Sequence, residues 1–331
     1  MTGIAERIAD EYKISSKTDA VIVCGPTASG KSDAAMELCS IIGGEIVSCD
    51  SMQIYRLMDI GTAKATPEMR QKIPHHMIDI ADPWGNYSLY MYKKAALAVI
   101  EDIISRGKVP VICGGTGLYV NTLIDNRQLT DLPDDSFFSE ESRLEKEKCD
   151  CLLKENDIDG LHLILEKNDP EAASQIHKNN VKRVYRSLCL YFMTGKTMAE
   201  RNDESLKSGS EYSFLTYCLM PDRGSLYRRI DARVDIMREA GLFNEAERVY
   251  SACRDNLPSD AAASLEILKL TALNAIGYKE LIPLFDFPEL KPLKIYNPDE
   301  AFDMIKRDSR QYAKRQITWF KRTPGASFIE I

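Results

Sequence analysis

The stretch AVIVCGPTASGKS, residues 20–32, decides the fold of this chain. Its first five residues are apolar and predict a buried strand, and GPTASGKS at 25–32 matches the pattern G-x-x-x-x-G-K-[ST] at every fixed position. A helix is predicted to begin at Gly30 or Lys31. A strand, a glycine turn and a helix in this order form a loop whose backbone N–H groups bind phosphate. The sequence therefore predicts a phosphate site at the end of its first strand.

The alternation of strands and helices continues after this loop. GGEIVSCDS predicts a short strand that ends at Asp50, residues 87–105 have helical apolar spacing, and KVPVICGGTG predicts a buried strand closed by glycines. Such alternation implies parallel strands with right-handed crossovers, in a three-layer α/β core like that of the P-loop NTPases. Ligands of such sheets bind beyond the carboxyl ends of the strands. We therefore expect Asp50, Thr116 and the phosphate loop to face one crevice.

The character of the chain changes at about residue 126. LPDDSFFSEESRLEKEKCDCLLKENDIDG is acidic and mostly helical in pattern, and the next predicted strand is SFLTYCLMP, which begins near Tyr212. We expect residues 126–200 to form a mainly helical insertion domain, and residues 1–125 and 201–331 to form the α/β core with its C-terminal helices. After the last predicted strand, the chain is expected to be helical to its end, except for a looser, Pro-containing stretch at 282–298.

Composition limits the possible functions. The 331 residues are 44% hydrophobic and 28% charged, which is typical of a soluble globular protein. No apolar run approaches the roughly 20 residues of a bilayer span, and the charged first residues exclude a signal peptide, so no membrane partner is expected. Nine cysteines without framework spacing predict reduced thiols and a cytoplasmic protein, which we expect to be monomeric. The net charge of −7 restricts any nucleic-acid surface to local basic clusters.

The phosphate loop and its surroundings favour group transfer over hydrolysis. Lys31 supplies a cation, and the Ser32 hydroxyl can ligate Mg²⁺ or cap the helix. The long strand before Thr116 ends in Gly-Gly-Thr, without the carboxylate that usually assists magnesium in nucleotide-hydrolysing proteins of this class. Asp50 leaves two alternatives open. Its carboxylate either faces the loop, as a base or as a partner of bound magnesium, or forms an Asx turn or helix cap.

Two basic clusters are candidates for contact with a phosphate backbone. The segment 301–322 carries seven Lys and Arg residues against two Asp residues, and helical spacing puts Arg307, Arg310, Lys314 and Lys321 on one stripe. The aromatic and aliphatic residues of the segment lie on the opposite side, where they are expected to pack on the body; they are Phe302, Ile305, Tyr312, Trp319 and Phe320. KRVYR at 182–186 is the second cluster. Solvated charged faces and nucleic-acid surfaces remain equal alternatives on this pattern alone.

Several separated stretches together resemble one family, the tRNA dimethylallyltransferases, also called tRNA isopentenyltransferases. The stretches are GPTASGKS, SCDSMQIYRLMDIGTAK, PHHMIDI, GGTGLYV, RVYRSL with TGKT, AIGYKEL and KRQITWFKR, in this order between residues 20 and 322. The resemblance implies that the loop holds the diphosphate of dimethylallyl diphosphate rather than ATP. It implies transfer of the dimethylallyl group to N6 of the adenosine 3′-adjacent to the anticodon, in tRNAs reading codons that begin with U. The chain shows no C-terminal zinc finger of eukaryotic relatives, so the bacterial type is expected.

The resemblance also implies roles for individual residues. Asp50 matches the general base, Thr116 lies near the reacting centre, and an arginine of LYRRIDARVD is expected at the diphosphate, with Arg229 preferred over Arg233. The diphosphate-binding residues are expected to be Gly25, Thr27, Ala28, Ser29, Gly30, Lys31 and Ser32, with Ser32 also holding Mg²⁺. The tRNA-binding residues are expected to be Asp50, Ser51, Met52, Gln53, Lys182, Arg183, Arg186, Asn274, Gly277, Tyr278, Lys279, Lys314, Arg315, Gln316, Trp319, Lys321 and Arg322.

Three other functions share part of this pattern. An isopentenyltransferase acting on free AMP or ATP would keep the loop and the base, but would not need the insertion or KRQITWFKR. A small-molecule P-loop kinase would consume ATP, and an RNA-binding switch protein would bind a nucleotide without transferring a prenyl group. The sequence departs from the family pattern at Ala65, where proline is common, and at residues 125–134, which affects the expected insertion boundary.

Overall fold

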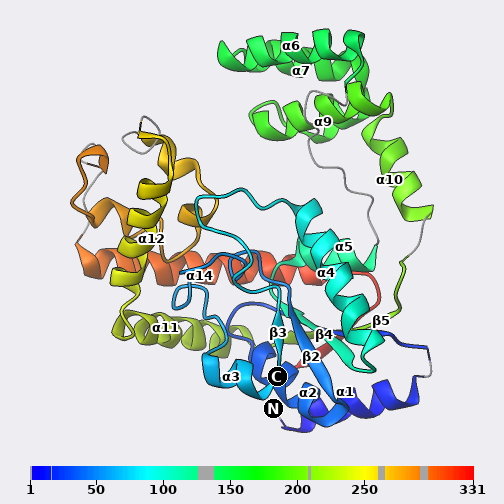
Figure 1. Ribbon diagram of the computed structural model, residues 1–331, viewed down its shortest axis with the longest axis vertical. Coiled ribbons are helices and arrows are strands. Elements are labelled where there is room, and N and C mark those ends of the chain that lie inside the picture. Colours follow the sequence, from blue (N-terminus) through cyan, green and yellow to red (C-terminus); the bar gives the residue numbers. More distant parts are fainter. Residues whose placement is uncertain (1, 16, 126–137, 208–209, 260–264, 291–296) are drawn as a thin grey trace. The chain divides into compact units, whose positions relative to one another are not determined.

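The computed structural model describes residues 2–15, 17–125, 138–207, 210–259, 265–290 and 297–331 (Figure 1). The chain divides into two compact units, one formed by residues 1–124 with 212–331 and the other by residues 125–211. The second unit ends at residue 211, whereas the sequence predicted a boundary at residue 200. Residue 200 falls inside helix α10 (Met198–Lys207). This helix contacts α8 (Pro170–Gln175) of the same unit. The expected start at residue 126 lies outside the described residues.

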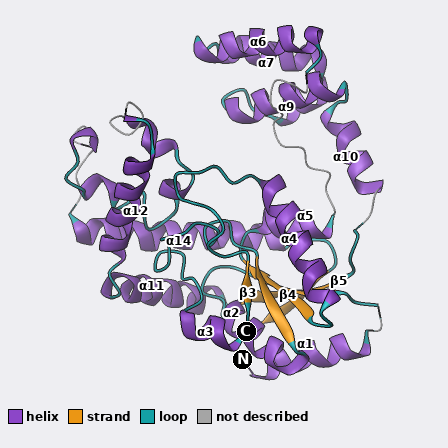
Figure 2. Ribbon diagram, in the orientation of Figure 1, coloured by secondary structure: helices purple, strands orange, loops and turns teal. Residues whose placement is uncertain are grey.

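A parallel sheet of six strands forms the centre of the first unit, in the order β3-β2-β4-β1-β5-β6. Figure 2 draws its strands in orange, with helices around them. In chain order the strands are β1 (Ala20–Cys24), β2 (Gly44–Ser48), β3 (His75–His76), β4 (Val109–Gly114), β5 (Phe214–Met220) and β6 (Ala326–Glu330). The predicted strands are confirmed as β1, β2, β4 and β5, although β2 ends at Ser48 and not at Asp50. The expectation of helix to the end of the chain is wrong at β6, which pairs with β5 at the sheet edge.

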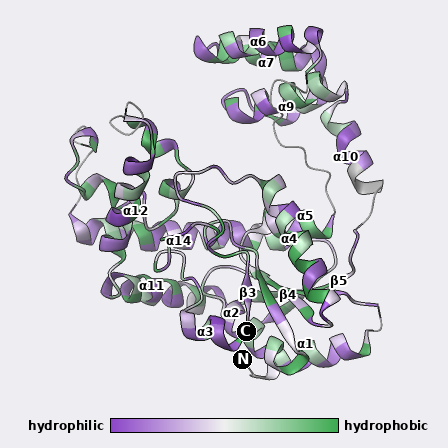
Figure 3. Ribbon diagram, in the orientation of Figure 1, coloured by the Kyte–Doolittle hydropathy of each residue, from purple (hydrophilic) through white to green (hydrophobic). Residues whose placement is uncertain are grey.

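Helices cover both faces of the sheet, as the predicted three-layer core requires. Residues of β1 alternate between the two faces: Val21 and Val23 pack with α1 (Thr2–Ile14) and α2 (Lys31–Ile42), whereas Ile22 packs with α4 (Leu89–Ser105) and α5 (Gly117–Ile124). All five residues of β1 are buried, in keeping with the hydrophobic colouring of the central strands in Figure 3. Burial on both faces explains why β1 reads as a continuous apolar run.

The chain after β5 builds a second hydrophobic core inside the same unit. Its elements are α11 (Arg223–Glu239), α12 (Leu242–Asn256), α14 (Pro298–Phe320) and the short 3₁₀ segments η2 (Leu265–Lys269), η3 (Ala272–Asn274), η4 (Ile282–Leu284) and η5 (Pro288–Leu290). Tyr250, Tyr278, Leu281 and Phe302 are buried there together with Tyr55 from the β2–β3 connection. Part of the stretch 282–298 that the sequence predicted to be loose lies outside the described residues.

The second unit is helical where it is described. It contains α6 (Glu140–Lys154), α7 (Ile158–Asn168), α8, α9 (Val181–Thr194) and α10. Leu161, Leu165, Val184 and Leu188 form its own small core. Asp169 connects its parts, because one carboxylate oxygen accepts from Ala172 N at 3.0 Å in α8 and the other from Met198 N at 2.6 Å in α10. No described helix of the chain combines the length and the apolar character that a bilayer span requires.

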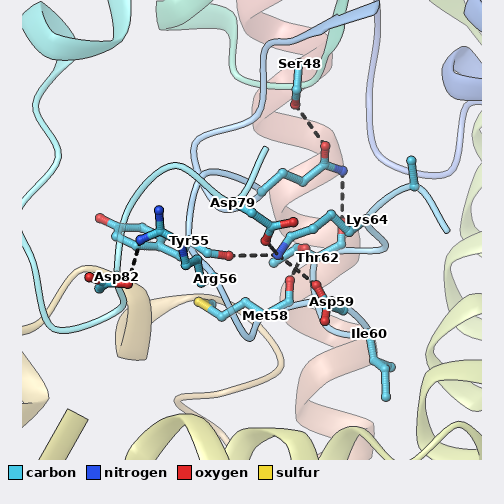
Figure 4. A network of polar contacts seen from close by, with 12 residues as sticks. Ser48, Tyr55, Arg56, Met58, Asp59, Ile60, Thr62, Lys64, Asp79 and Asp82 are labelled. Atoms are coloured by element: carbon cyan, nitrogen blue, oxygen red, sulfur yellow. Dashed lines mark hydrogen bonds and ion pairs between the residues drawn. The ribbon is translucent and has the colours of Figure 1, made fainter. Parts of the chain in front are cut away.

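A buried lysine holds the long connection between β2 and β3 in shape (Figure 4). Lys64 has 1% of its side chain exposed, and its Nζ donates to Tyr55 O at 2.8 Å, Asp59 Oδ1 at 2.8 Å and Asp79 Oδ1 at 2.7 Å. Arg70 also contacts Asp79, at 2.7 Å. Burial alone would raise the pKa of Asp79, but hydrogen bonds and charge from Lys64 and Arg70 outweigh it and lower the pKa.

We expect Lys64→Met to destabilise the protein by about 1–3 kcal/mol at pH 7, because Asp59 and Asp79 lose their shared cation. The lowered pKa of Asp79 contributes stability above its unfolded pKa, and this contribution is lost as pH falls. The deficit should therefore shrink below about pH 4. Urea unfolding of both proteins measures it. Lys72→Met, at an exposed position of α3 (Pro67–Lys72), is the control. A deficit that stays constant down to about pH 3 would contradict the electrostatic explanation.

Candidate functional site

A cavity of about 610 Å³ lies beyond the carboxyl ends of the central strands. The phosphate loop, the turn that follows β2 and the last two residues of β4 contribute to it, together with the 3₁₀ segment near Asn274 and the helices α11 and α14; Thr116, which was expected to face the same crevice, is not among the lining residues. Among the residues that line it are Lys31, Ser32, Asp50, Gln53, Thr62, Arg233, Met237, Asn274, Tyr312 and Arg315. Parts of the chain that are far apart in sequence therefore meet in one crevice, as the positions of the loop and Asp50 predicted.

The phosphate loop has the backbone that its glycines predict. Gly25 has φ +151° and lies so close to β5 that a Cβ would be 2.7 Å from Leu219 O. Gly30 has φ +81° and is the N-cap of α2, whose first-turn N–H groups have no acceptors within the helix. The Ser29 hydroxyl is buried, without a hydrogen-bond partner among the described residues. The anion-binding groups of this loop are therefore backbone amides, in addition to Lys31 and Ser32.

Lys31 is held inside the site. Its Nζ donates to Pro26 O at 3.2 Å. Burial lowers the pKa of Lys31, the nearby Arg233 charge acts in the same direction, and the Asp50 charge opposes both. The Cys113 thiol also lines the cavity, and burial raises its pKa to about 11, so it is a neutral thiol at physiological pH. Two cations in one desolvated place indicate a site made for an anion.

The structure separates the two arginines that the sequence proposed for the diphosphate. Arg233 is partly buried and lines the cavity, whereas Arg229, one turn earlier on α11, is exposed and absent from the lining. Burial lowers the pKa of Arg233, and the charge of Asp50 opposes this shift. The preference for Arg229 is therefore corrected. The two positions are four residues apart, so sequence spacing alone could not decide which one faces inward.

Asp50 both faces the cavity and forms an Asx turn, which the sequence had left as alternatives. Its Oδ1 accepts a hydrogen bond from Met52 N at 3.0 Å, which is an Asx turn, and the residue also lines the cavity. Thr116 fixes the neighbouring backbone, because its Oγ1 accepts from Ser51 N at 3.0 Å. Thr116 N itself donates to Cys49 O at 3.1 Å. The turns after β2 and β4 are thus joined next to the carboxylate.

Two of the residues predicted to contact RNA make internal hydrogen bonds instead. Gln53 accepts from the Ser48 hydroxyl at 2.9 Å through Oε1, and its Nε2 donates to Thr62 O at 3.2 Å (Figure 4). Tyr278 is fully buried, and its hydroxyl donates to Glu245 Oε1 at 2.7 Å. Tyr278 is therefore corrected from a nucleic-acid contact to a core residue. Its neighbours Asn274 and Lys279 are exposed and line the cavity.

The C-terminal part of α14 and the two residues that follow it present several predicted RNA contacts to solvent. Lys314, Arg315, Lys321 and Arg322 are exposed, and no ion pair involves any of them within the described residues. Trp319 is 41% exposed, and one side of its ring packs on the body as expected, against α5. Its ring covers α5 where a Cβ on Gly117 would lie 2.2 Å from Cδ1. A second, open cavity of about 800 Å³ is lined by Asn121, Gln311, Lys314, Arg315, Thr318, Trp319 and Arg322.

The expected basic stripe of α14 is only partly available for binding. Arg310 pairs with Asp231, Lys306 pairs with Asp235 at 2.5 Å, and Arg307 contacts Asp308 at 2.9 Å. Gln316 is 5% exposed and hydrogen-bonds inside the protein, so its predicted RNA contact is corrected as well. The positive charges of Arg307 and Arg310 are therefore compensated by carboxylates. Among the described residues, Lys314 and Lys321 of the same stripe have no ion-pair partner.

The second basic cluster lies on α9, in the other unit. Lys182 and Arg183 are exposed in the first turn of this helix, and Arg186 is half-buried. Tyr185 does not face solvent as a stacking group, because its hydroxyl donates to Asp150 Oδ1 at 2.5 Å. Positive charge at a helix N-terminus opposes the helix dipole. These two basic side chains therefore contribute little to the stability of α9.

Two residues that shape the site carry no sequence signal, one in the cavity wall and one behind it. Tyr312 was expected only to pack, but it lines the cavity; burial and the Asp50 charge raise its pKa to about 12, while hydrogen bonding with Thr116 acts against the shift. Glu245 of α12 is buried and accepts from Asp59 N, Ile60 N and Gly61 N at 2.8 to 3.0 Å, besides the hydroxyl of Tyr278. Neither belongs to a recognisable motif, and only their place in the fold identifies them.

Comparison with known proteins gives a consistent result over nearly the whole chain. The model of the family described as IPP transferase matches residues 53–323. The tRNA dimethylallyltransferase of Carboxydothermus hydrogenoformans is 41% identical over 310 residues, which cover 94% of this chain and 91% of that protein. The tRNA dimethylallyltransferase of Staphylococcus aureus is 40% identical over 314 residues, covering 94% and 92%.

Solved structures agree with these relatives. The full-length tRNA isopentenylpyrophosphate transferase of Bacillus halodurans aligns with a TM-score of 0.64 and 36% identity, covering 95% of this chain and 90% of that chain. A eukaryotic dimethylallyltransferase whose structures were determined acting on tRNA aligns with a TM-score of 0.79 and 29% identity, covering 95% and 74%.

The placement of the two arginines gives a testable prediction. We expect Arg233→Ala to weaken the binding of inorganic diphosphate at least about tenfold, because a desolvated cation facing the anion is lost. Arg229→Ala is the matched control, on the same helix and exposed, and should bind diphosphate as the wild type does. Isothermal titration with Mg²⁺ and diphosphate measures both. Equal losses in the two variants would show that the cavity wall is not the anion site.

Proposed function

Because the chain belongs to the IPP transferase family, we propose that it is a tRNA dimethylallyltransferase. It transfers the dimethylallyl group of dimethylallyl diphosphate to N6 of the adenosine 3′-adjacent to the anticodon, in tRNAs reading codons that begin with U. The observation that carries this proposal is the cavity itself. A phosphate loop and two half-buried cations, Lys31 and Arg233, line one part of it, and Asp50, with Thr116 next to it, supplies a carboxylate.

The reaction exchanges one bond to the allylic carbon for another. The lone pair of the N6 amine forms the C–N bond, the C–O bond breaks, and its electron pair leaves with the diphosphate. Lys31, Arg233 and the first-turn amides of α2 stabilise the negative charge that grows on the leaving oxygen. Because these groups are fixed before the substrate arrives, they need little reorganisation during the step. Their burial also keeps water from the allylic carbon.

The acceptor amine needs a base. The lone pair of the adenine N6 is delocalised into the ring, so the amine becomes a competent nucleophile only as its proton is removed. Asp50 lines the cavity and takes that proton through the carboxylate oxygen that does not bond to Met52 N. The Asx turn holds the other oxygen and so fixes the orientation of the carboxylate. Thr116, which bonds to Ser51 N, keeps this turn in place.

The residues present fit a magnesium ion. The Ser32 hydroxyl and the Asp50 carboxylate both line the cavity, and Mg²⁺ prefers such oxygen ligands together with the oxygens of a diphosphate. When bound, the ion neutralises charge on the diphosphate and makes it a better leaving group. Ser32 would hold it directly at the N-terminus of α2. Among the described residues no three His, Cys, Asp or Glu side chains gather as a metal site of their own, which agrees with an ion that binds with its substrate.

The acceptor base must leave its stack to enter the cavity, which costs a few kcal/mol. Exposed basic residues at the end of α14 and directly after it, the Trp319 ring and the α9 cluster can offset this cost through phosphate contacts and stacking. Lys279 is paired with Asp308 at 3.3 Å and would exchange this partner for a phosphate. We assign these residues to RNA binding, with Ser51 and Met52 at the cavity wall beside the acceptor base. We further propose that the enzyme works as a monomer in the cytoplasm, a reducing compartment in which its nine free thiols are expected to persist.

Incubation with dimethylallyl diphosphate, Mg²⁺ and unmodified tRNA should yield a prenylated adenosine, detected by mass after digestion. We expect Asp50→Asn to lower kcat about 10²- to 10⁴-fold, because the amide cannot accept the N6 proton, while tRNA and diphosphate still bind. Asp10→Asn, at an exposed position of α1, is the matched control. Near-normal transfer by Asp50→Asn would exclude Asp50 as the base.

The same assay separates the other functions that share the loop. Turnover with free AMP or ATP in place of tRNA would identify a free-nucleotide prenyltransferase. Release of labelled phosphate from ATP would identify a kinase, and tight nucleotide binding without prenyl transfer would identify a switch protein. We expect none of these three results.

A further inference from the structure

Gln316 is a buried amide near the C-terminal end of α14, on the inner side of a helix whose outer side is charged. The side chain belongs to KRQITWFKR, between the exposed Arg315 and Trp319, yet only 5% of the residue is exposed. Its place on the inner side of α14 directs it towards the sheet, and it borders the cavity. A long polar side chain that is buried at this depth needs partners for both ends of its amide.

Both ends are satisfied by the backbone of two different turns. Gln316 Oε1 accepts from Thr27 N at 2.8 Å, in the phosphate loop after β1. Gln316 Nε2 donates to Gly115 O at 2.9 Å, in the turn after β4. The fit is close, because a Cβ on Gly115 would lie 2.4 Å from Nε2. Gln316 is therefore a bridge between the two turns.

The bridge joins the two halves of the proposed chemistry. Thr27 begins the turn that leads to Lys31 and Ser32, which face the diphosphate. Gly115 precedes Thr116, whose hydroxyl holds Ser51 N beside the proposed base. Tyr312, one helical turn before Gln316, lines the cavity and interacts with both Thr116 and Gln316. The amide of Gln316 thus sets the spacing between the leaving group and the base.

We propose that Gln316 is a positioning residue for the transfer reaction and not a contact to RNA. This inference rests on the proposed function, because it assigns the phosphate loop to the leaving group and Asp50 to the acceptor. An error of about 1 Å in such a spacing can lower a rate about 10²-fold. The amide is suited to the task because it donates on one side and accepts on the other, at every pH at which the enzyme works.

Gln316→Glu tests the proposal through its pH dependence. The ionised carboxylate of this variant can still accept from Thr27 N, but it has no proton for Gly115 O and its second oxygen faces that carbonyl. We expect kcat of the variant to be about 10- to 100-fold below wild type near pH 8. Burial raises the pKa of a carboxyl group, so protonation on lowering the pH restores the donor. The ratio of variant to wild-type kcat should therefore rise as pH falls towards about 6.

Two further variants separate this effect from other causes. Gln316→Ala removes both hydrogen bonds, so its ratio of variant to wild-type kcat should be low at every pH. Gln71→Glu makes the Gln-to-Glu change at an exposed position of α3, and its kcat should follow that of the wild type. Binding is measured with inorganic diphosphate and Mg²⁺, and separately with an unmodified anticodon stem-loop RNA. The Gln316 variants should weaken diphosphate binding and leave RNA binding within about twofold of wild type, as expected for a group that positions the phosphate loop and does not touch RNA.

The proposal is overturned by a Gln316→Glu ratio that does not change with pH, or by a loss of RNA affinity with unchanged diphosphate affinity. The diphosphate titration does not depend on prenyl transfer. If the wild type fails to prenylate RNA, the proposed function fails, while the diphosphate affinities of the variants still decide whether Gln316 sets the phosphate loop.

Discussion

The structure depends on the pairing of β1 with strands from two distant parts of the chain. Val21 pairs with Val111 on one side and with Leu215 on the other, all in parallel. Parallel pairing brings the carboxyl ends of these strands to one edge of the sheet, and each strand continues there into a turn with a functional group. The phosphate loop follows β1, Thr116 follows β4, and α11 with Arg233 follows β5. Residues 125–211 are inserted before β5, so this pairing forms only when the chain returns from its second unit.

Buried polar side chains behind the cavity hold other parts of its wall together, namely the connection between β2 and β3 and the segment that contains Tyr278. Glu245 accepts three backbone amides of residues 59–61 and the hydroxyl of Tyr278, so one carboxylate joins two segments of the wall. Gly61 has no room for a side chain there, because a Cβ would lie 2.5 Å from the Tyr278 ring. Lys64 and Gln53 use backbone carbonyls of the same connection. A buried charge of this kind is tolerable only where donors or counter-charges satisfy it. Such satisfied networks make the cavity wall rigid.

The parts of the structure that the sequence predicted are those in which the local residue pattern alone determines the conformation or the burial. GPTASGKS specifies its own turn, since Gly25 and Gly30 need conformations that other residues avoid, and the apolar runs of β1 and β4 are buried on both faces. Strand β6 was missed because it is an edge strand with exposed positions, held only by β5. Arg229 and Arg233 carry the same chemistry, and their separation in space depends on how α11 packs against α14. Tyr278 and Gln316 lie in stretches that resemble the family, but a motif does not tell which of its residues face inward.

The electrostatics of the cavity follow from this architecture and explain why the site is selective for an anion. Lys31 and Arg233 are both desolvated, and burial lowers the pKa of each, so the folded protein holds two cations at a cost in free energy. Asp50 compensates only part of this cost, because its single charge acts on both cations and on the Tyr312 hydroxyl. An anion bound here, such as the diphosphate of the proposed reaction, would supply negative charge and reduce the repulsion between the cations. Ligand binding and folding stability are therefore linked at this site. The same excess of positive charge would also stabilise the negative charge that develops on the leaving group in the proposed reaction.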